Sequence, residues 1–153
     1  MSKLDHRIPP PVVALACAAL AWGLTRLTPA LALHLPHRLG IALGVAGAGL
    51  ALEIWALLHF RRARTTISPL SPHKASAIVR AGPYRFTRNP MYLGMAIQLV
   101  AFCLWLANPL ALIAVAVFVA CITRFQIQPE ERAIAAKFGE SYARYRSQVR
   151  RWL

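Results

Sequence analysis

The sequence contains few acidic residues. Of its 153 residues five are Asp or Glu, against 18 Lys or Arg, so the formal net charge at pH 7 is +13. Charged residues make up 15% and hydrophobic residues 58% of the chain, and the mean hydropathy is +0.48. So apolar a composition excludes an ordinary soluble domain. Because the apolar residues come in blocks, it predicts membrane spans.

Cysteine is scarce as well. Cys17, Cys103 and Cys121 all lie inside apolar runs, and none belongs to a CxxC pair or has a histidine at ligand spacing. We therefore predict packing residues, with no disulfide and no metal site. The basic residues flank apolar blocks and no nucleic-acid recognition signature appears, so we predict no nucleic-acid partner.

Four apolar blocks indicate an all-α integral membrane protein with about four transmembrane helices, at residues 10–27, 39–60, 91–106 and 110–125. The first block also fits a signal peptide, but we favour a span. Asn108-Pro109 predicts a tight hairpin between the last two helices. Both are slightly short, so whether they cross the bilayer fully is open.

Two further features concern the second block and the tail. Gly40-x-x-x-Gly44 predicts close helix packing and would permit a homodimer. In the tail, Pro129 is expected to start a basic amphipathic helix that lies on the membrane surface and breaks at Gly139. All lysines and arginines except Arg26 and Arg38 lie in residues 1–9, 61–88 and 124–151. The positive-inside rule then places both termini, the long loop 61–88 and the active site in the cytoplasm.

Glu53 lies inside the second apolar block, where a carboxylate is costly. Two interpretations stand at this point. Its side chain bonds a neighbouring helix, through Gln98 or Arg124, or it lines a reaction cavity.

Residues 82–94, GPYRFTRNPMYLG, combine two prolines, two glycines and two arginines. Each proline disfavours helix at the residue before it, so Gly82 and Asn89 should be non-helical. We expect Asn89 to cap a helix that starts at Pro90. A rigid, arginine-bearing loop at a helix N-terminus suits an anionic group.

The predicted hairpin brings this motif close to Glu130 and Glu131, because both lie at the same end of the third and fourth helices. The site would then combine cations, aromatic rings and two carboxylates, which suits a zwitterionic nucleoside-like ligand. The cations are Arg85 and Arg88, and the rings are Tyr84, Phe86 and Tyr92. The alternative is that these residues are interfacial anchors and a favourable first helical turn.

Three elements occur in a specific order: Gly82-Pro83-Tyr84-Arg85-x-x-Arg88-Asn89-Pro90-x-Tyr92-x-Gly94, Glu130-Glu131-Arg132, and Phe138-Gly139-x-x-Tyr142-x-x-Tyr145. This pattern resembles the isoprenylcysteine carboxyl methyltransferase family and the related phospholipid methyltransferases. The resemblance covers the C-terminal half and implies an integral-membrane methyltransferase that uses S-adenosylmethionine. The length of 153 residues leaves room for a single domain, 1–153, with two spans and a basic loop in 1–80 and the cofactor-binding half, which carries the resemblance, in 81–153.

Carried over, the resemblance places Arg88, Pro90, Tyr92 and Gly94 in the cofactor pocket, with Glu130 and Glu131 as its acids. We add Tyr84, Arg85 and Asn89 as cofactor-binding candidates, and expect catalytic roles for Glu131, Arg88 and Glu53. One departure concerns Asn89, because the carboxyl methyltransferases commonly have His there. Asn cannot act as a base near neutral pH.

The sequence does not identify the methyl acceptor, beyond a lipid or another apolar small molecule that reaches the site from the bilayer. A thiolate or carboxylate acceptor needs no base. An amine or hydroxyl would need one, and Glu53, His59 and Glu131 are candidates. Two other functions remain open at this point: a non-catalytic membrane protein that binds anionic lipid through its basic tail, and a nicotinamide-dependent membrane reductase.

Overall fold

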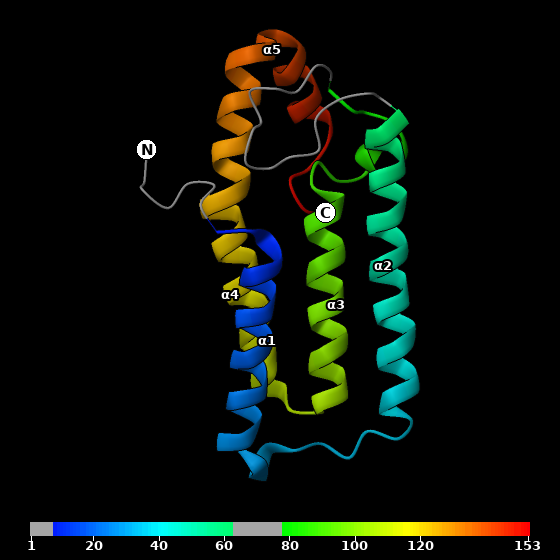
Figure 1. Cartoon of the computed structure of the whole chain (residues 1–153), viewed down its shortest axis with the longest axis vertical. Coiled ribbons are helices and arrows are strands. Elements are labelled where there is room, and N and C mark those ends of the chain that lie inside the picture. Colours follow the sequence, from blue (N-terminus) through cyan, green and yellow to red (C-terminus); the bar gives the residue numbers. More distant parts are fainter. Residues whose placement is uncertain (1–7, 63–77) are drawn as a thin grey trace.

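The computed structural model describes residues 8–62 and 78–153, and in this part the chain is almost entirely helical (Figure 1). The elements in order are α1 (Pro10–Leu27), η1 (Pro29–Leu31), α2 (Arg38–Arg62), η3 (Gly82–Arg85), α3 (Pro90–Leu106), η4 (Pro109–Leu112), α4 (Ile113–Ile122), η5 (Thr123–Ile127) and α5 (Gln128–Gln148). The all-α prediction is confirmed. Most of the predicted polar loop, residues 63–77, lies outside the described residues.

The chain is an integral membrane protein by the length and apolarity of its helices. Three described helices are long and apolar enough to cross a bilayer: α1, α2 and the continuous helix Pro109–Gln148. The fourth, α3, is apolar but has 17 residues, which is shorter than the roughly 20 that a span requires. A full crossing by α3 therefore stays a prediction.

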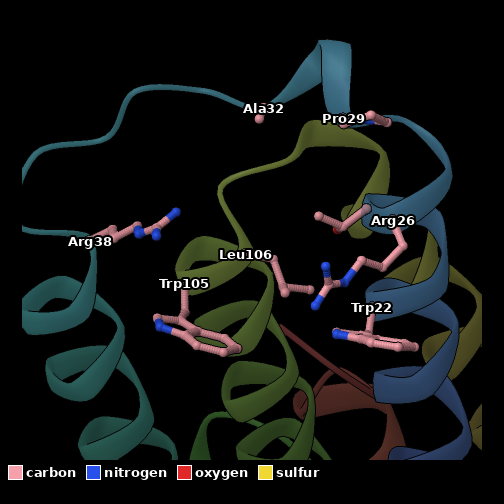
Figure 2. A pocket seen from close by; sticks show the side chains of 8 residues that line it. Trp22, Arg26, Pro29, Ala32, Arg38, Trp105 and Leu106 are labelled. Atoms are coloured by element: carbon pink, nitrogen blue, oxygen red, sulfur yellow. The ribbon is translucent and has the colours of Figure 1, made fainter.

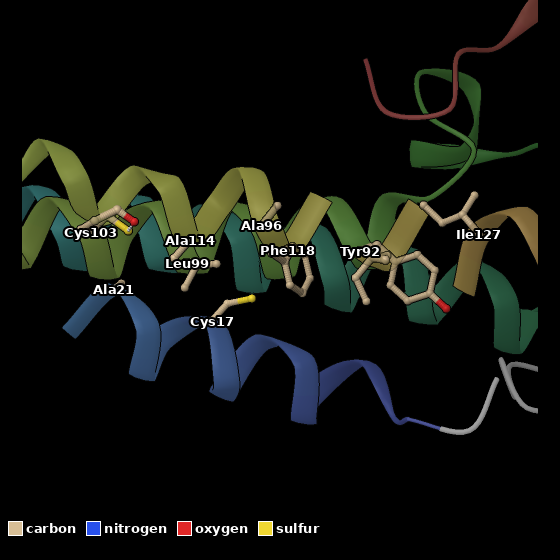
Figure 3. Packing of buried hydrophobic residues seen from close by; sticks show 11 residues of the cluster. Cys17, Ala21, Tyr92, Ala96, Leu99, Cys103, Ala114, Phe118 and Ile127 are labelled. Atoms are coloured by element: carbon tan, nitrogen blue, oxygen red, sulfur yellow. Dashed lines mark hydrogen bonds between the residues drawn. The ribbon is translucent and has the colours of Figure 1, made fainter. Parts of the chain in front are cut away.

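The third helix is the centre of the molecule. In Figure 1 α3 lies between α2 on one side and α1 with α4 on the other. Its buried side chains meet small residues of α1 and larger ones of α4, as Figure 3 shows for Cys17 and Phe118. Cys17 and Cys103 are buried in this core, which confirms their predicted packing role.

The contact between α2 and α3 is close because two glycines face each other. A Cβ atom added at Gly49 would lie 2.8 Å from the Gly94 carbonyl oxygen, and the reverse distance is also 2.8 Å. Gly40 and Gly44, by contrast, have no atom of another described element within 4 Å of such a Cβ atom. The predicted packing at Gly40-x-x-x-Gly44 is therefore wrong within this chain, because the helices meet one to two turns further on.

The predicted hairpin at Asn108-Pro109 is confirmed. Ala107 ends α3 in a left-handed conformation with φ 51°, and Asn108 Oδ1 accepts a 3.0 Å hydrogen bond from the Leu110 amide. Asn108 Nδ2 donates to the backbone oxygen of Thr28 at 3.0 Å, which ties the turn to the end of α1. One asparagine thus orients three helix ends.

The sequence predicts that a new helix begins at Pro129. In the structure no separate helix begins there, because α4 continues through η5 into α5. The segment η5 is a turn of π-helix directly before Pro129. A proline ring clashes with the carbonyl four residues earlier in a regular α-helix, and the wider π-turn relieves that clash. The predicted break at Gly139 is confirmed by its φ of 50° and ψ of −123°.

Candidate active site

The motif begins with a turn that is pressed against α2. Gly82 has φ 62°, which confirms its predicted non-helical backbone, and a Cβ atom there would lie 2.5 Å from Nε2 of His59. The His59 ring is held by a 3.0 Å hydrogen bond from Nδ1 to the Trp55 carbonyl oxygen. Only glycine accommodates both the conformation and the approach of the imidazole. The turn therefore brings His59 to the motif.

Tyr84 is buried between this turn and the last helix. Its ring meets Phe60 of α2 edge-on with centroids 5.2 Å apart, and its backbone oxygen accepts a 2.7 Å hydrogen bond from the Tyr145 hydroxyl. Burial, with Tyr145 and Glu130 nearby, raises the pKa of Tyr84 well above its usual value. Tyr84 therefore stays neutral and joins α2 to α5.

Asn89 is non-helical, as predicted, with φ −130° and ψ 55°, but its side chain does not cap α3. Its Nδ2 atom instead donates a 2.9 Å hydrogen bond to the backbone oxygen of Arg151. The predicted helix start at Pro90, with Asn89 at the N-cap position, is confirmed, but the capping hydrogen bond from the Asn89 side chain is not formed. The Asn89 amide itself donates to the hydroxyl oxygen of Thr87 at 3.2 Å, two residues earlier.

Arg88 is the most enclosed cation of the motif, with a side chain only 8% exposed. Its Nη2 donates to Oε1 of Glu131 at 2.7 Å. Its Nη1 donates to the backbone oxygens of Arg146, at 3.3 Å, and Val149. Its Nε is buried and has no hydrogen-bond partner in the described part of the chain. A buried guanidinium donor without a partner is a place where an anionic ligand would be stabilised.

Glu131 is held from two sides. Arg88 binds one carboxylate oxygen, and Arg151 donates to both, at 3.1 Å from Nε and 2.7 Å from Nη2. Burial alone would raise the pKa of Glu131, but the hydrogen bonds from Arg151 and Arg88 outweigh it and lower that pKa. Near neutral pH Glu131 is thus an ionised link between the motif and residue 151.

Glu130 has different surroundings from its neighbour. It lies beyond the apolar span, at the charged start of α5, and its Oε1 accepts a 2.6 Å hydrogen bond from the Tyr92 hydroxyl. Burial raises the pKa of Glu130 to about 8, against the opposing effect of the Tyr92 hydroxyl and with a contribution from the charge of Glu131. Two adjacent carboxylates therefore differ in charge near neutral pH, which is a common arrangement at functional sites.

Residues 149–152, which we call the C-terminal strand-like segment, form part of the site, and the sequence does not predict this. This segment runs beside the motif: the Arg88 amide donates to the Arg150 oxygen at 2.9 Å, and the Thr87 hydroxyl to the Arg151 oxygen at 3.2 Å. Trp152 anchors its end through a 3.0 Å hydrogen bond from Nε1 to the Thr123 hydroxyl. Most of these contacts use backbone oxygens, which every residue type provides. No pattern of residue types in the sequence therefore predicts them.

The remaining residues of the predicted site differ from one another in exposure and in the elements that they contact. Arg85 and Phe86 are exposed, whereas Pro90 is buried at the start of α3. Gly94 lies against α2, where its lack of a side chain admits the Glu53 side chain. Glu53 accepts a 3.0 Å hydrogen bond from Gln98, which confirms the first interpretation of this carboxylate and does not test the second.

With this geometry in view, the comparison with known families is decisive. The model of the phospholipid methyltransferase family matches residues 35–141, more than two thirds of the chain. The chain belongs to this family. It is thereby placed in the group of integral-membrane methyltransferases that also contains the isoprenylcysteine carboxyl methyltransferases.

A relative of this chain is similar to it in sequence, but its name states no activity. An uncharacterized protein of Haemophilus influenzae (strain ATCC 51907 / DSM 11121 / KW20 / Rd) is 48% identical to this chain over 63 residues. These residues make up 41% of this chain and the whole of that protein. No solved structure matches the chain.

Proposed function

We propose that this protein is an integral-membrane methyltransferase that uses S-adenosylmethionine and methylates a lipid or another apolar small molecule. One observation carries the proposal beyond family membership. The fold brings Arg88 and Tyr92, at the start of α3, into contact with Glu131 and Glu130 respectively, at 2.7 and 2.6 Å. A cation, a phenol and a carboxyl group thus lie together where the start of α3 meets the start of α5.

The residues present fit the chemistry of S-adenosylmethionine. Its carboxylate matches Nε of Arg88, and its ribose hydroxyls or ammonium match Glu130. Among residues 8–62 and 78–153, that Nε has no hydrogen-bond partner and the Glu130 carboxyl group has the neutral hydroxyl of Tyr92. The buried rings of Tyr84 and Tyr92 make the protein apolar behind these polar groups. When bound, S-adenosylmethionine supplies a methyl group that is already activated by the sulfonium. Asn89 and Arg85, one bound to the Arg151 oxygen and the other exposed, remain weaker candidates for contact.

The two acids have different roles in this proposal. Glu131 uses its oxygens on Arg88 and Arg151, so it positions Arg88 and does not itself bind the cofactor. Its lowered pKa also makes it a poor base. Arg88 and Glu130 are then the groups that contact the cofactor. Methyl transfer depends mainly on positioning and exclusion of water, so a carboxylate or thiolate acceptor requires nothing more.

An amine acceptor would need a proton acceptor, and two predicted candidates keep that role in our proposal. Glu53 has one oxygen bonded to Gln98, about one helical turn deeper than the motif. His59 donates through Nδ1 to Trp55, so the lone pair of its neutral ring is on Nε2, against Gly82. We place this corner, and both termini, on the cytoplasmic side on the basis of charge distribution.

Calorimetric binding of S-adenosylhomocysteine to the purified protein tests the proposal. We expect saturable binding to the wild type and a loss of about tenfold or more in Arg88→Ala and Glu130→Gln, since each removes a charged or hydrogen-bonding partner. Arg144→Ala and Glu140→Gln are matched controls, because both residues are exposed on α5. Unchanged affinity in the first two variants would overturn the site, and absence of binding to the wild type would overturn the cofactor.

The acceptor requires a second experiment. Transfer of a labelled methyl group into fractionated membrane extract, followed by mass identification of the product, would define its class. We expect the label in an apolar or amphipathic product. Label in water-soluble products alone would contradict the proposed acceptor.

A further inference from the structure

The end of the molecule opposite the motif contains a second polar region that methyl transfer does not use. A pocket of about 420 Å³ lies there, between the end of α1, the connector after it, the start of α2 and the end of α3. It is lined by Trp22, Thr25, Arg26, Pro29, Ala32, Arg38, Trp105 and Leu106. Figure 2 shows the Arg26 and Arg38 side chains on opposite sides of the space above Trp105 and Leu106.

This pocket is too far from the motif to belong to the same site. Tyr92 and Leu106 are at opposite ends of α3, and at 1.5 Å per residue they are about 21 Å apart along its axis. A molecule in the pocket therefore cannot present an atom for methylation at Arg88 and Glu130. The pocket needs its own ligand.

The arginine and tryptophan side chains that line the pocket offer donors only, and the Thr25 hydroxyl oxygen is the one side-chain acceptor among the lining residues. Arginine and tryptophan side chains donate hydrogen bonds and accept none. The one hydroxyl, that of Thr25, already donates to the Ala21 oxygen at 2.9 Å. The Arg26 guanidinium lies over the ring of Trp22, 5.1 Å from its centroid, which holds it at the pocket wall. Because donors outnumber acceptors, the lining favours a ligand that brings acceptors for the two arginines.

The arginines also lack an acidic counterpart. No residue that lines the pocket is acidic, and the acids of the described chain are used elsewhere or lie on α5: Glu53, Glu130, Glu131 and Glu140. Arg38 stands at the start of α2, whose first turn contains no acid. A cation there opposes the helix dipole, whereas an anion would be stabilised by the dipole and by Arg38 together.

The surroundings favour a membrane lipid as the carrier of that anion. The pocket lies at the ends of the apolar helices, where tryptophan and arginine mark the bilayer interface. Large apolar residues that adjoin the lining residues in the sequence are exposed, among them Leu27, Leu31 and Leu39. Acyl chains can therefore continue along the helices from a headgroup held in the pocket.

We propose that this pocket binds the phosphate of an anionic phospholipid in the leaflet opposite the methyl-transfer corner. Arg26 and Arg38 hold the phosphate from two sides, and the tryptophans contact the glycerol region. The lipid closes the space between α1 and α2, which pack on α3 but hardly on each other. The site therefore stabilises the helix arrangement and takes no part in the reaction.

The test uses the full chain in lipid nanodiscs that contain phosphatidylglycerol and phosphatidylcholine. Native mass spectrometry counts the lipid that stays bound when the protein is released. We expect the wild type to retain phosphatidylglycerol selectively and Arg26→Gln/Arg38→Gln to bind it about 30-fold more weakly, since each arginine contributes about fivefold. Arg61→Gln/Arg62→Gln, with the same charge change at the other end of α2, should retain it. Arg26→Lys/Arg38→Lys should recover most of the binding.

Equal retention in the first double variant, or an equal loss in the Arg61 and Arg62 control, would overturn the proposal. Inorganic phosphate serves as the competitor. If it displaces phosphatidylglycerol at equal concentration, the ligand is the free anion and the lipid is overturned. Thermal unfolding in phosphatidylcholine discs checks the fold. If the double variant unfolds, Arg26→Gln and Arg38→Gln alone carry the test, each with about a fivefold loss.

Discussion

The hydroxyl of Tyr92 donates a 2.6 Å hydrogen bond to the carboxylate of Glu130, 38 residues further along the chain. This contact joins the first turn of α3 to the first turn of α5 and lies next to the ion pair of Arg88 with Glu131. Two parallel links thus fasten the motif to the last helix. Of the two acids, Glu130 has capacity left for a ligand, because Glu131 is already shared by two arginines.

The first prediction concerns the energy of that link. Tyr92→Phe should lower the free energy of unfolding by about 1–3 kcal/mol, the usual range for a hydrogen bond to a group that is charged part of the time. Glu130→Gln keeps an acceptor and should cost less. Unfolding in detergent of both single variants and the double variant gives the coupling free energy. Additive effects would mean that the hydroxyl and the carboxyl do not interact in solution.

The second prediction concerns the dependence of stability on pH. Glu130 and Glu131 should contribute to it with opposite signs. The folded-state pKa of Glu130, about 8, lies above its ordinary value of 4.5. Its contribution to stability is therefore full below pH 4.5 and is lost as the pH rises through 8. The folded-state pKa of Glu131 is lowered, so its contribution is present above pH 4.5 and is lost as the pH falls through that lowered pKa.

Unfolding midpoints measured from pH 3 to 9 distinguish the two acids. Glu130→Gln should remove the decline between about pH 4.5 and 8, and Glu131→Gln should remove the decline on the acidic side. Glu140→Gln, at an exposed position of the same helix, should change neither. A wild-type profile that Glu130→Gln leaves unaltered would contradict the raised pKa of Glu130.

The third prediction concerns Gly94, whose role in the structure is packing. Gly94→Ala would push its new methyl group into the Glu53 side chain and to 2.8 Å from the Gly49 oxygen, so α2 and α3 would have to move apart. We expect a loss of about 1–3 kcal/mol of stability. Gly44→Ala, where no atom of another described element lies within 4 Å of the added Cβ, should be neutral or stabilising by up to about 1 kcal/mol. Similar stabilities for the two variants would show that the helices do not meet here.

The fourth prediction concerns the docking of the C-terminal strand-like segment. Asn89→Asp replaces the donor that binds the Arg151 oxygen with an acceptor, so the two oxygens repel each other. We expect faster hydrogen exchange in residues 149–153 and weaker binding of S-adenosylhomocysteine, while the spans stay folded. Asn89→Ala should have a smaller effect because it removes the bond without repulsion. Exchange rates equal to those of the wild type in both variants would exclude a role of Asn89 in docking.

Features that depend on strong local preferences were predictable. Asn108-Pro109 separates two uncharged apolar runs and leaves little choice but a hairpin. That hairpin alone implies that residues 82–94 approach Glu130 and Glu131. Glu53 needs a polar partner inside an apolar block, and Gln98 is one of few available. These inferences required only chain connectivity and the cost of a buried charge.

Other features could not be predicted, because they depend on backbone and packing geometry that no characteristic residues mark in the sequence. Pro129 normally begins a helix, and the π-turn that lets α4 continue through it has no characteristic residues. Gly49 and Gly40 look alike in the sequence, although only Gly49 faces α3. Asparagine commonly caps helices through its side chain, but the side chain of Asn89 binds a backbone oxygen 62 residues away instead.

The contacts of residues 149–152 also determine when the corner can form during synthesis. Arg88 leaves the ribosome some sixty residues before the carbonyl groups that its side chain and amide will bind. At about 5–20 residues per second, α3 therefore exists for several seconds with an unmatched guanidinium near its first turn. Insertion of α3 and α4 as a pair, after Glu131 has emerged, avoids exposing that charge to hydrocarbon.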